Sequence, residues 1–155
     1  FRLVIGDIKM PYKFETTKQR SELMQKIRSI DTKPETLFRK SLWAKGIRYR
    51  KNNRKLPGKP DICISKQKIA IFIDGEFWHG FDWENKKRKI KANRDYWIPK
   101  IEKNIERDKN YKILLENDGW IDLRFWETEI KKKPTECLEI VLALVTSEGK
   151  DNENI

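Results

Sequence analysis

The chain has 155 residues and a net charge of +11, because 35 Lys and Arg residues outnumber 24 Asp and Glu residues. This length is sufficient for one domain with a hydrophobic core, and six Trp, seven Phe and four Tyr residues argue against a disordered chain. Unless lysine is simply abundant in the source proteome, so large a positive charge favours a polyanionic partner: a nucleic acid, a membrane surface or an acidic protein.

Cysteine usage and hydropathy narrow the class further. Cys63 and Cys137 form no CxxC pair, which argues against a zinc knuckle or a disulfide scaffold. No apolar run approaches the roughly 20 residues of a transmembrane helix, and the first residues lack the apolar segment of a signal peptide. We therefore expect one soluble intracellular domain over residues 1–155, with an N-terminal arm at 1–16 and a loose polar tail at 147–155.

The first part of the chain predicts two helices. Residues 17–29 carry a narrow apolar stripe surrounded by basic residues, which fits either a solvated helix or an arm that contacts DNA. A second helix begins near Thr32, where Thr32 and Glu35 have the spacing of a capping box, Pro34 suits the first turn and Gly46 is a good stop. These residues alone favour Glu35 as a helix cap rather than a catalytic group.

Strands and a long helix follow. Short strands are expected at 47–50, 61–65 and 68–74, the last two joined as a hairpin, with a loop or frayed helix at 84–93. A long helix at about 95–116, a strand at 120–126 and a helix at 134–145 complete the pattern. This order predicts an α/β fold with a mixed central sheet, in which the third and fourth strands are parallel.

Two positions in this frame suggest hydrolytic chemistry. Asp61 follows a rigid proline turn and opens a buried hairpin, a place where hydrolases hold Mg²⁺ with carboxylates from neighbouring elements, although the Pro60-Asp61 pair alone also fits a simple turn. His79 is the only histidine, and it follows Phe77 and Trp78 at the end of an apolar strand. It is the one ordinary candidate for a base near neutral pH, although a lone histidine is often structural.

The long helix adds two polar residues to a buried face. Asn104 and Asp108 share the face of Ile101 and Ile105 at helical spacing. A carboxylate among core positions must have a partner or a chemical task. Asp108 is therefore a candidate functional residue that is expected to pair with another polar side chain.

In combination, these segments resemble the Vsr family, the very-short-patch-repair DNA mismatch endonucleases. The resemblance covers roughly residues 17–128, and the motifs occur in the family's order. They are DTKPE at 31–35, LPGKPD at 56–61, FIDGEFWHG at 72–80, Tyr96-Trp97 with Lys100, Ile101, Asn104, Arg107 and Asp108, and finally Gly119-Trp120 with Phe125-Trp126-Glu127.

The resemblance implies a restriction-endonuclease-like fold of the PD-(D/E)xK class and a Mg²⁺-dependent endonuclease. The metal would be held by Asp61 and by the main-chain carbonyl of Ile73. His79 would be the general base, oriented by Asp108. Glu35 matches an active-site glutamate of the family, and Asn104 would support the site.

The resemblance also implies the substrate, which is duplex DNA nicked on one strand beside a T:G mismatch. Phe77, Trp78 and Trp97 match the family's aromatics that wedge into the base stack, where rings recover stacking energy of about 1–3 kcal/mol per base. The expected DNA contacts further include Met24, Lys59, Lys87 and Arg88. A monomer in the bacterial cytoplasm, bound to the nucleoid through DNA, is expected, with mismatch-repair proteins and a cytosine methyltransferase as possible companions.

The sequence departs from the family at the structural zinc site. The positions that carry Cys and His ligands in the family read Glu76, Phe81, Trp83 and Thr128 here, so we expect no zinc and expect apolar packing by Phe81 and Trp83 instead. Because this loop borders the wedge aromatics, two alternatives stay open. One is a restriction or mobile-element endonuclease of other specificity, and the other is a DNA-binding module without activity.

Overall fold

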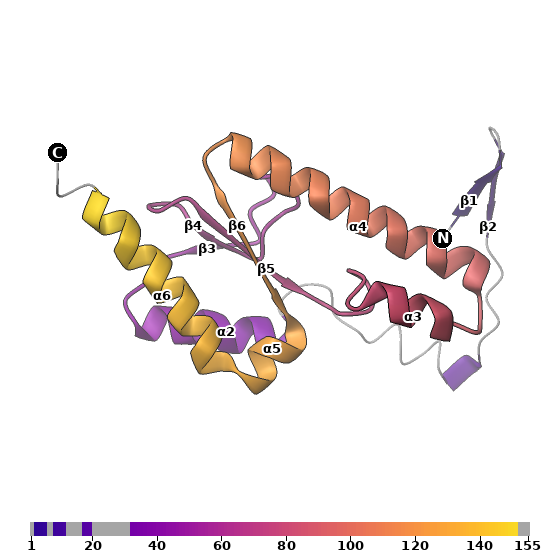
Figure 1. The fold of residues 1–155 in the computed structure, drawn as a ribbon, viewed down its shortest axis with the longest axis horizontal. Coiled ribbons are helices and arrows are strands. Elements are labelled where there is room, and N and C mark those ends of the chain that lie inside the picture. The colour runs from indigo at the N-terminus through magenta and orange to yellow at the C-terminus, as the bar shows by residue number, and fades with distance from the viewer. Residues whose placement is uncertain (1, 6–7, 12–16, 20–31, 152–155) are drawn as a thin grey trace.

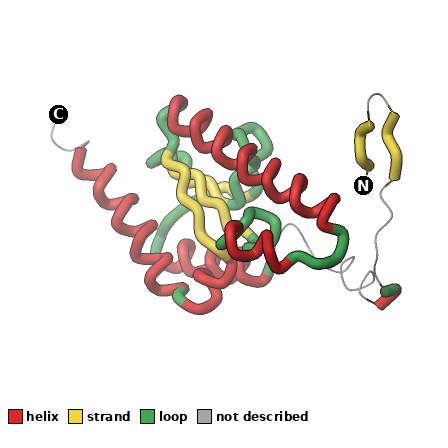
Figure 2. Tube along the Cα trace, turned by 45° about the vertical axis from the view of Figure 1, so that its right-hand side comes forward, coloured by secondary structure: helices red, strands yellow, loops and turns green. Residues whose placement is uncertain are grey.

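The computed structural model describes residues 2–5, 8–11, 17–19 and 32–151, and its centre is a four-stranded mixed sheet (Figures 1 and 2). The strand order is β3-β4-β5-β6, with bounds Arg50–Lys51, Ile62–Ile64, Ile69–Asp74 and Ile121–Trp126. β3, β4 and β5 are antiparallel neighbours, and β5 pairs with β6 in parallel. The predicted α/β class and the predicted parallel pair are both confirmed.

Helices cover both faces of this sheet. They are α2 (Lys33–Ala44), α3 (Trp83–Lys89), α4 (Arg94–Asn117), α5 (Glu127–Lys132) and α6 (Pro134–Asp151). In Figure 1, α4 lies on one side of the sheet, and α2, α5 and α6 lie on the other. Among the described helices, none combines the length and apolar character needed to cross a bilayer.

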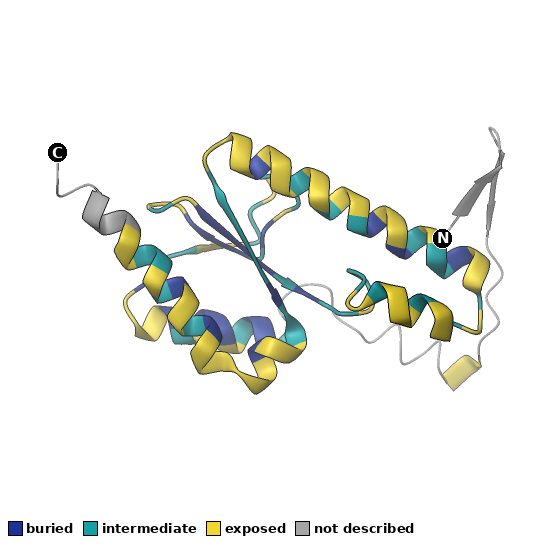
Figure 3. Ribbon diagram, in the orientation of Figure 1, coloured by how far each residue is buried: buried dark blue, intermediate teal, exposed yellow. Residues whose placement is uncertain are grey.

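The alternation of side chains along β5 divides the core into two clusters. Ile69 and Ile71 belong to the larger cluster with residues of α2, α5 and α6. Ala70 and Phe72 point to the opposite face, where they pack against Leu115 of α4. β5 is buried along most of its length (Figure 3), as expected of a central strand covered on both sides.

The register of β5 and β6 determines which residues meet at their carboxyl ends. Phe72 lies opposite Arg124, and Asp74 lies opposite Trp126. Because alternate residues share a face, Phe72, Asp74 and Arg124 all lie on the face that α4 covers. The charged side chains of Asp74 and Arg124 are thus placed on neighbouring strands beneath α4.

Several predicted boundaries differ from the structure. The strand expected at 47–50 is reduced to Arg50–Lys51, and Ile47 instead enters the core. Residues 83–89 form a true helix, α3, and α5 was not predicted. Of the loose tail expected at 147–155, residues 147–151 are helical, since α6 continues to Asp151, and residues 152–155 lie outside the described residues. The hydroxyls of Thr146 and Ser147 bond to carbonyls of their own helix, which makes these polar residues compatible with it.

The N-terminal region is only partly described. β1 (Arg2–Ile5) and β2 (Ile8–Pro11) pair in antiparallel fashion as a separate two-stranded sheet. Most of the predicted helix at 17–29, including Met24, lies outside the described residues.

Substitution of two isoleucines, one buried and one exposed, tests this description of the core. Ile71→Ala should lower the free energy of unfolding by roughly 2–5 kcal/mol, because Ile71 has no exposed surface and its truncation leaves a cavity. Ile113→Ala on α4 is the matched control, since Ile113 is 55% exposed, and it should change stability by less than about 0.5 kcal/mol. Urea unfolding monitored by circular dichroism measures both values, and equal effects would contradict the placement of β5 in the core.

Candidate active site

The segment that follows β5 is held against α4 by two features. The side-chain amide of Asn104, which is buried on α4, donates a hydrogen bond of 3.0 Å to the carbonyl oxygen of Trp78. Gly80 has a positive φ of 73°, and any β-carbon there would collide with Ile105 of α4. Only glycine therefore allows this close approach, which fixes the position of His79 between Trp78 and Gly80.

His79 lies beside Asp108, and its Nδ1 is 2.6 Å from the Asp108 Oδ2. Burial alone would lower the pKa of His79, but the hydrogen bond to Asp108 and the negative charges of Asp74 and Asp108 raise it above its ordinary value. Burial would raise the pKa of Asp108, yet the same hydrogen bond and the positive charges of His79 and Arg124 lower it. The structure thus brings together two of the predicted site residues, which are 29 positions apart in the sequence.

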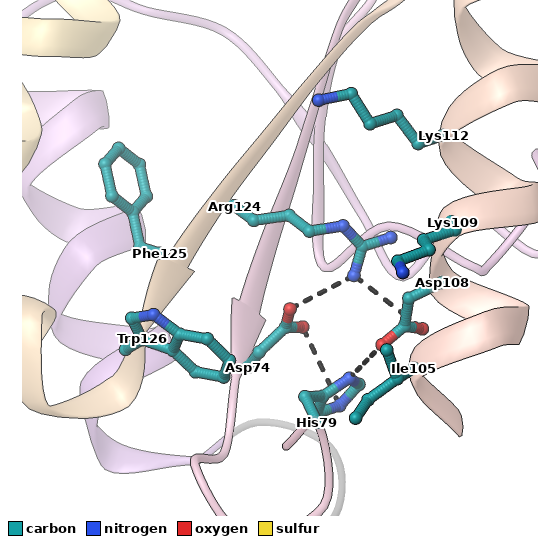
Figure 4. Close-up of a pocket in the computed structure, with 9 residues that line it drawn as sticks. All are labelled: Asp74, His79, Ile105, Asp108, Lys109, Lys112, Arg124, Phe125 and Trp126. Atoms are coloured by element: carbon teal, nitrogen blue, oxygen red, sulfur yellow. Dashed lines mark hydrogen bonds and ion pairs between the residues drawn. The ribbon is translucent and has the colours of Figure 1, made fainter. Parts of the chain in front are cut away.

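Asp74 and Arg124 complete this group, and the sequence analysis did not select either of them. Arg124 Nη1 lies 3.1 Å from Asp74 Oδ2 and 3.8 Å from Asp108 Oδ1, and His79 Nε2 lies 3.7 Å from Asp74 Oδ1 (Figure 4). A signal for Arg124 was present in the sequence. A charged residue in the alternating strand Ile121–Trp126 has to face one covered side of the sheet, where it needs a partner.

A cavity of about 250 Å³ opens between β6 and α4 beside these residues. Its wall includes Asp74, His79, Asp108 and Arg124, together with Lys109 and Lys112 of α4 (Figure 4). The imidazole is therefore partly accessible, with 24% of its side chain exposed, whereas the Asp74 side chain is only 8% exposed.

Asp61 lies on the other side of β5, immediately before β4. Its Oδ2 accepts a hydrogen bond of 2.7 Å from the backbone N–H of Ile73. Burial, assisted by the negative charges of Glu35 and Asp74, raises the pKa of Asp61 to about 7, although the Ile73 amide and His79 oppose the shift. Asp61 therefore lies within electrostatic reach of Glu35, Asp74 and His79.

Glu35 does not act as the predicted helix cap. Thr32 occupies the N-cap position of α2 but makes no side-chain capping hydrogen bond. Glu35 is 2% exposed and accepts a hydrogen bond of 2.7 Å from Arg39 Nη1, one helical turn further on. Its carboxylate is turned inwards, where it affects Asp61, and the capping-box prediction was wrong for this reason.

Two groups of residues have the donor atoms to hold a metal ion. The first is Asp61 with the carbonyl of Ile73. In a strand, the N–H and C=O of one residue point to the same side, so the Ile73 carbonyl faces the side from which its N–H reaches Asp61. The second group is Asp74, His79 and Asp108, whose donor atoms lie within 4.8 Å of one another. The guanidinium of Arg124 already supplies positive charge to the two carboxylates of this second group.

The three predicted wedge aromatics form one cluster. The ring centroids of Phe77, Trp78 and Trp97 are 5.2 to 5.4 Å apart in edge-to-face contacts. Tyr96, which is buried, supports Trp97 at 4.9 Å, and Phe77 remains 41% exposed. The structure therefore brings these rings together, and two of them, Phe77 and Trp78, directly precede His79 in the chain.

The basic residues predicted to contact DNA are in different situations. Lys59 and Arg88 are exposed. Lys87 Nζ lies 2.6 Å from Glu102 Oε1, so part of its charge is neutralised within the chain.

The four positions that replace the zinc ligands of the family make other contacts. Glu76 Oε1 accepts a hydrogen bond of 2.8 Å from the backbone N–H of Thr128, at the start of α5. Phe81 packs edge-to-face on Trp126 with 5.2 Å between centroids, as expected of apolar packing. Trp83 instead donates a hydrogen bond of 3.4 Å to Glu102. These contacts join the loop after β5 to the end of β6 and to α4.

The raised pKa of Asp61 leads to a prediction about the stability of the folded chain. Without divalent metal at pH 8, Asp61→Asn should raise the free energy of unfolding by roughly 2–4 kcal/mol. The pKa of Asp61 is about 7 in the folded chain against an ordinary 3.8, so the folded chain binds a proton at Asp61 more tightly than the unfolded chain does. This proton favours folding fully below pH 4, and the stabilisation is lost as the pH rises through 7. The gain should shrink as pH is lowered towards 4. Urea unfolding at several pH values measures it.

The exposed Asp118 provides the matched control, because Asp118→Asn changes the same atoms at the end of α4. An equal gain from both variants would show that Asp61 is not destabilised by its surroundings.

The sequence of the chain was compared with known protein families and with individual known proteins. Residues 13–85 match the profile described as DNA mismatch endonuclease Vsr. The chain is 50% identical over 126 residues to the type II nicking enzyme V.NmeDIP of Neisseria meningitidis. The aligned region covers 81% of this chain and 85% of that protein. It is 49% identical over 131 residues to the type II nicking enzyme V.HpaIIP of Haemophilus parainfluenzae, covering 83% and 93%.

The E. coli DNA mismatch endonuclease Vsr is a more distant relative. It is 34% identical over 113 residues, which is 72% of this chain and 71% of that protein. Because relatives named as nicking enzymes match most of both chains, this chain belongs to the Vsr family of DNA endonucleases.

Proposed function

We propose that this endonuclease uses Mg²⁺ to nick one strand of duplex DNA beside a T:G mismatch. The observation that carries the proposal is the position of His79, which is bound to Asp108 at 2.6 Å and lies within electrostatic reach of Asp61. The family description and the name of the E. coli relative, both DNA mismatch endonuclease, support the mismatch as the target.

The surroundings of Asp61 suit a hard divalent cation. Burial and two neighbouring carboxylates make its negative charge unfavourable in the free chain, which raises its pKa to about 7. Mg²⁺ prefers carboxylate and carbonyl oxygens and keeps several waters, so Asp61 and the Ile73 carbonyl would hold it. When bound, the ion would neutralise the negative charge that develops on the phosphate.

His79 is arranged to take a proton from water. With its Nδ1 bonded to Asp108, the neutral imidazole presents Nε2 as the free basic nitrogen. Nε2 is 3.7 Å from Asp74, longer than a hydrogen bond, and within the described residues it has no hydrogen-bond partner. A water at Nε2 would transfer its proton to His79 and attack phosphorus, and the bond from phosphorus to the leaving oxygen would break. The carboxylate of Asp108 would stabilise the resulting imidazolium.

The aromatic cluster would recognise the lesion by its weak stacking. A mismatched pair costs less to unstack than a matched one, and inserted rings recover stacking energy. Phe77 is the most exposed of the three wedge rings, and Trp78 and Trp97 support it from behind. Because Trp78 precedes His79 in the chain, insertion of these rings would also determine which phosphodiester reaches the imidazole.

A nicking assay tests the catalytic part of the proposal. Wild-type protein with Mg²⁺ should nick a labelled T:G duplex in preference to matched T:A and C:G duplexes and should stop when the metal is chelated. Asp61→Ala and His79→Ala should each lower the rate by about 100-fold or more, while Asp118→Ala keeps it. Undiminished cleavage by Asp61→Ala would contradict the site assignment. Equal cutting of all duplexes would indicate a nuclease of other specificity, and binding without cleavage would indicate a silent DNA-binding module.

Substitution of the exposed ring tests the wedge. Phe77→Ala should weaken binding to the T:G duplex by roughly 10- to 100-fold, in line with about 1–3 kcal/mol of lost stacking per base, and should weaken binding to matched DNA much less. Trp43→Ala is the control, because Trp43 on α2 is also an exposed aromatic, at 51%. Fluorescence anisotropy without divalent metal measures both affinities. An equal loss on matched and mismatched duplexes would contradict a mismatch-reading role.

A further inference from the structure

Arg124 contacts the carboxylates on both sides of His79, although it lies on a different strand. Its Nη1 is 3.1 Å from Asp74 Oδ2 and at an ion-pair distance of 3.8 Å from Asp108 Oδ1. The other oxygen of each carboxylate faces the imidazole, at 3.7 Å from Nε2 for Asp74 and at 2.6 Å from Nδ1 for Asp108. The four side chains therefore form a closed ring (Figure 4).

The position of the guanidinium is set by the protein itself. Arg124 Nε and Nη2 lie 3.1 and 3.5 Å from the two oxygens of Asp122, whose side chain is 1% exposed. Its Cζ also lies 4.0 Å from the ring centroid of Phe72, the residue opposite it in the sheet. Three nitrogens of one planar group are thus directed at carboxylates before any DNA is bound, an arrangement that lysine cannot reproduce.

We infer that Arg124 is a positioning residue for His79, because it fixes the Asp74 and Asp108 carboxylates that hold the imidazole in one orientation and one tautomer. This inference rests on the proposed role of His79 as the base. Asp74 is 5% exposed, so the loss of Arg124 would leave a buried carboxylate without its cation. An unpaired buried carboxylate moves towards water, and this movement removes a contact that holds the imidazole.

Arg124 is a less suitable DNA-binding residue than its charge suggests. Its side chain is 22% exposed and its nitrogens face three carboxylates, whereas Lys109 and Lys112 present their charge at the wall of the same cavity. A phosphate contact and a positioning role predict different measurements. The first affects affinity for DNA, and the second affects the rate after DNA is bound.

Kinetics of Arg124→Gln distinguish these roles. Single-turnover nicking with saturating protein should slow by about 10- to 100-fold, while the Kd for the same duplex should change less than about threefold. Arg124→Lys, which keeps the charge but not the fork, should recover part of the rate. Lys45→Gln is the control, because it removes one exposed positive charge at the end of α2, outside the cavity wall, and it should keep the wild-type rate. A weaker Kd with an unchanged single-turnover rate would overturn the inference.

The tautomer of His79 gives a readout that does not depend on catalysis. His79 is the only histidine, so nitrogen-15 NMR of a tag-free protein reports on one imidazole. The neutral wild-type ring should carry its proton on Nδ1, and Arg124→Gln should shift the population towards the Nε2 tautomer. A double variant, Asp74→Asn with Arg124→Gln, removes the charge of the carboxylate that faces Nε2 of the imidazole and provides a second test if Arg124→Gln folds poorly. In it, the Nδ1 tautomer should recover in part. An unchanged tautomer in Arg124→Gln, or no recovery in the double variant, would overturn the inference.

The variant His79→Ala separates a failure of the proposed function from a failure of the proposed role of Arg124. If His79→Ala nicks as fast as wild type, the proposed function of the site fails. If His79→Ala is inactive and Arg124→Gln matches wild type in rate and tautomer, only the role of Arg124 fails. A fall in thermal stability of Arg124→Gln with an unchanged single-turnover rate would mean that Arg124 is merely structural.

Discussion

The hydrogen bond between His79 and Asp108 is the interaction on which the arrangement of the site depends. It joins the loop after β5 to the middle of α4, and it is supported by the contact of Asn104 with Trp78 one helical turn away. Gly80 allows this approach because a side chain at its position would collide with Ile105. One face of α4 therefore holds both the imidazole and the peptide that precedes it.

The parallel pairing of β5 and β6 adds the second half of the site. It places Asp74 and Arg124 on the same face of the sheet, under α4, while Asp61 reaches β5 from the β4 side. The acidic groups are thus separated into two environments. Around Asp61, burial and neighbouring carboxylates raise the pKa to about 7, which suits a site that binds a divalent cation. Around Asp108, His79 and Arg124 supply positive charge and lower the pKa of the carboxylate.

Much of the fold could be predicted from the sequence, because local signals agreed with the tertiary structure. The apolar run within Ile69–Asp74, the turns before and after the strands and the apolar stripe of the long helix were each sufficient to assign an element. Errors occurred where local signals are weak or ambiguous. The capping-box spacing of Thr32 and Glu35 was present, but the Glu35 carboxylate instead bonds Arg39 within the core. The polar end of α6 satisfies its hydroxyls within its own helix, so polarity there did not indicate a loose tail.

The sequence by itself determined which residue types were available: a single histidine, a carboxylate before a buried hairpin, a carboxylate on an apolar helix face and adjacent aromatics. Only the tertiary structure decided which of them meet. Asp74 looked like a residue that ends a strand, and Arg124 looked like one charge among many, because the contact that joins them is not local in the sequence. They are 50 positions apart and come together through the register of two parallel strands, which depends on long-range pairing that no local pattern encodes.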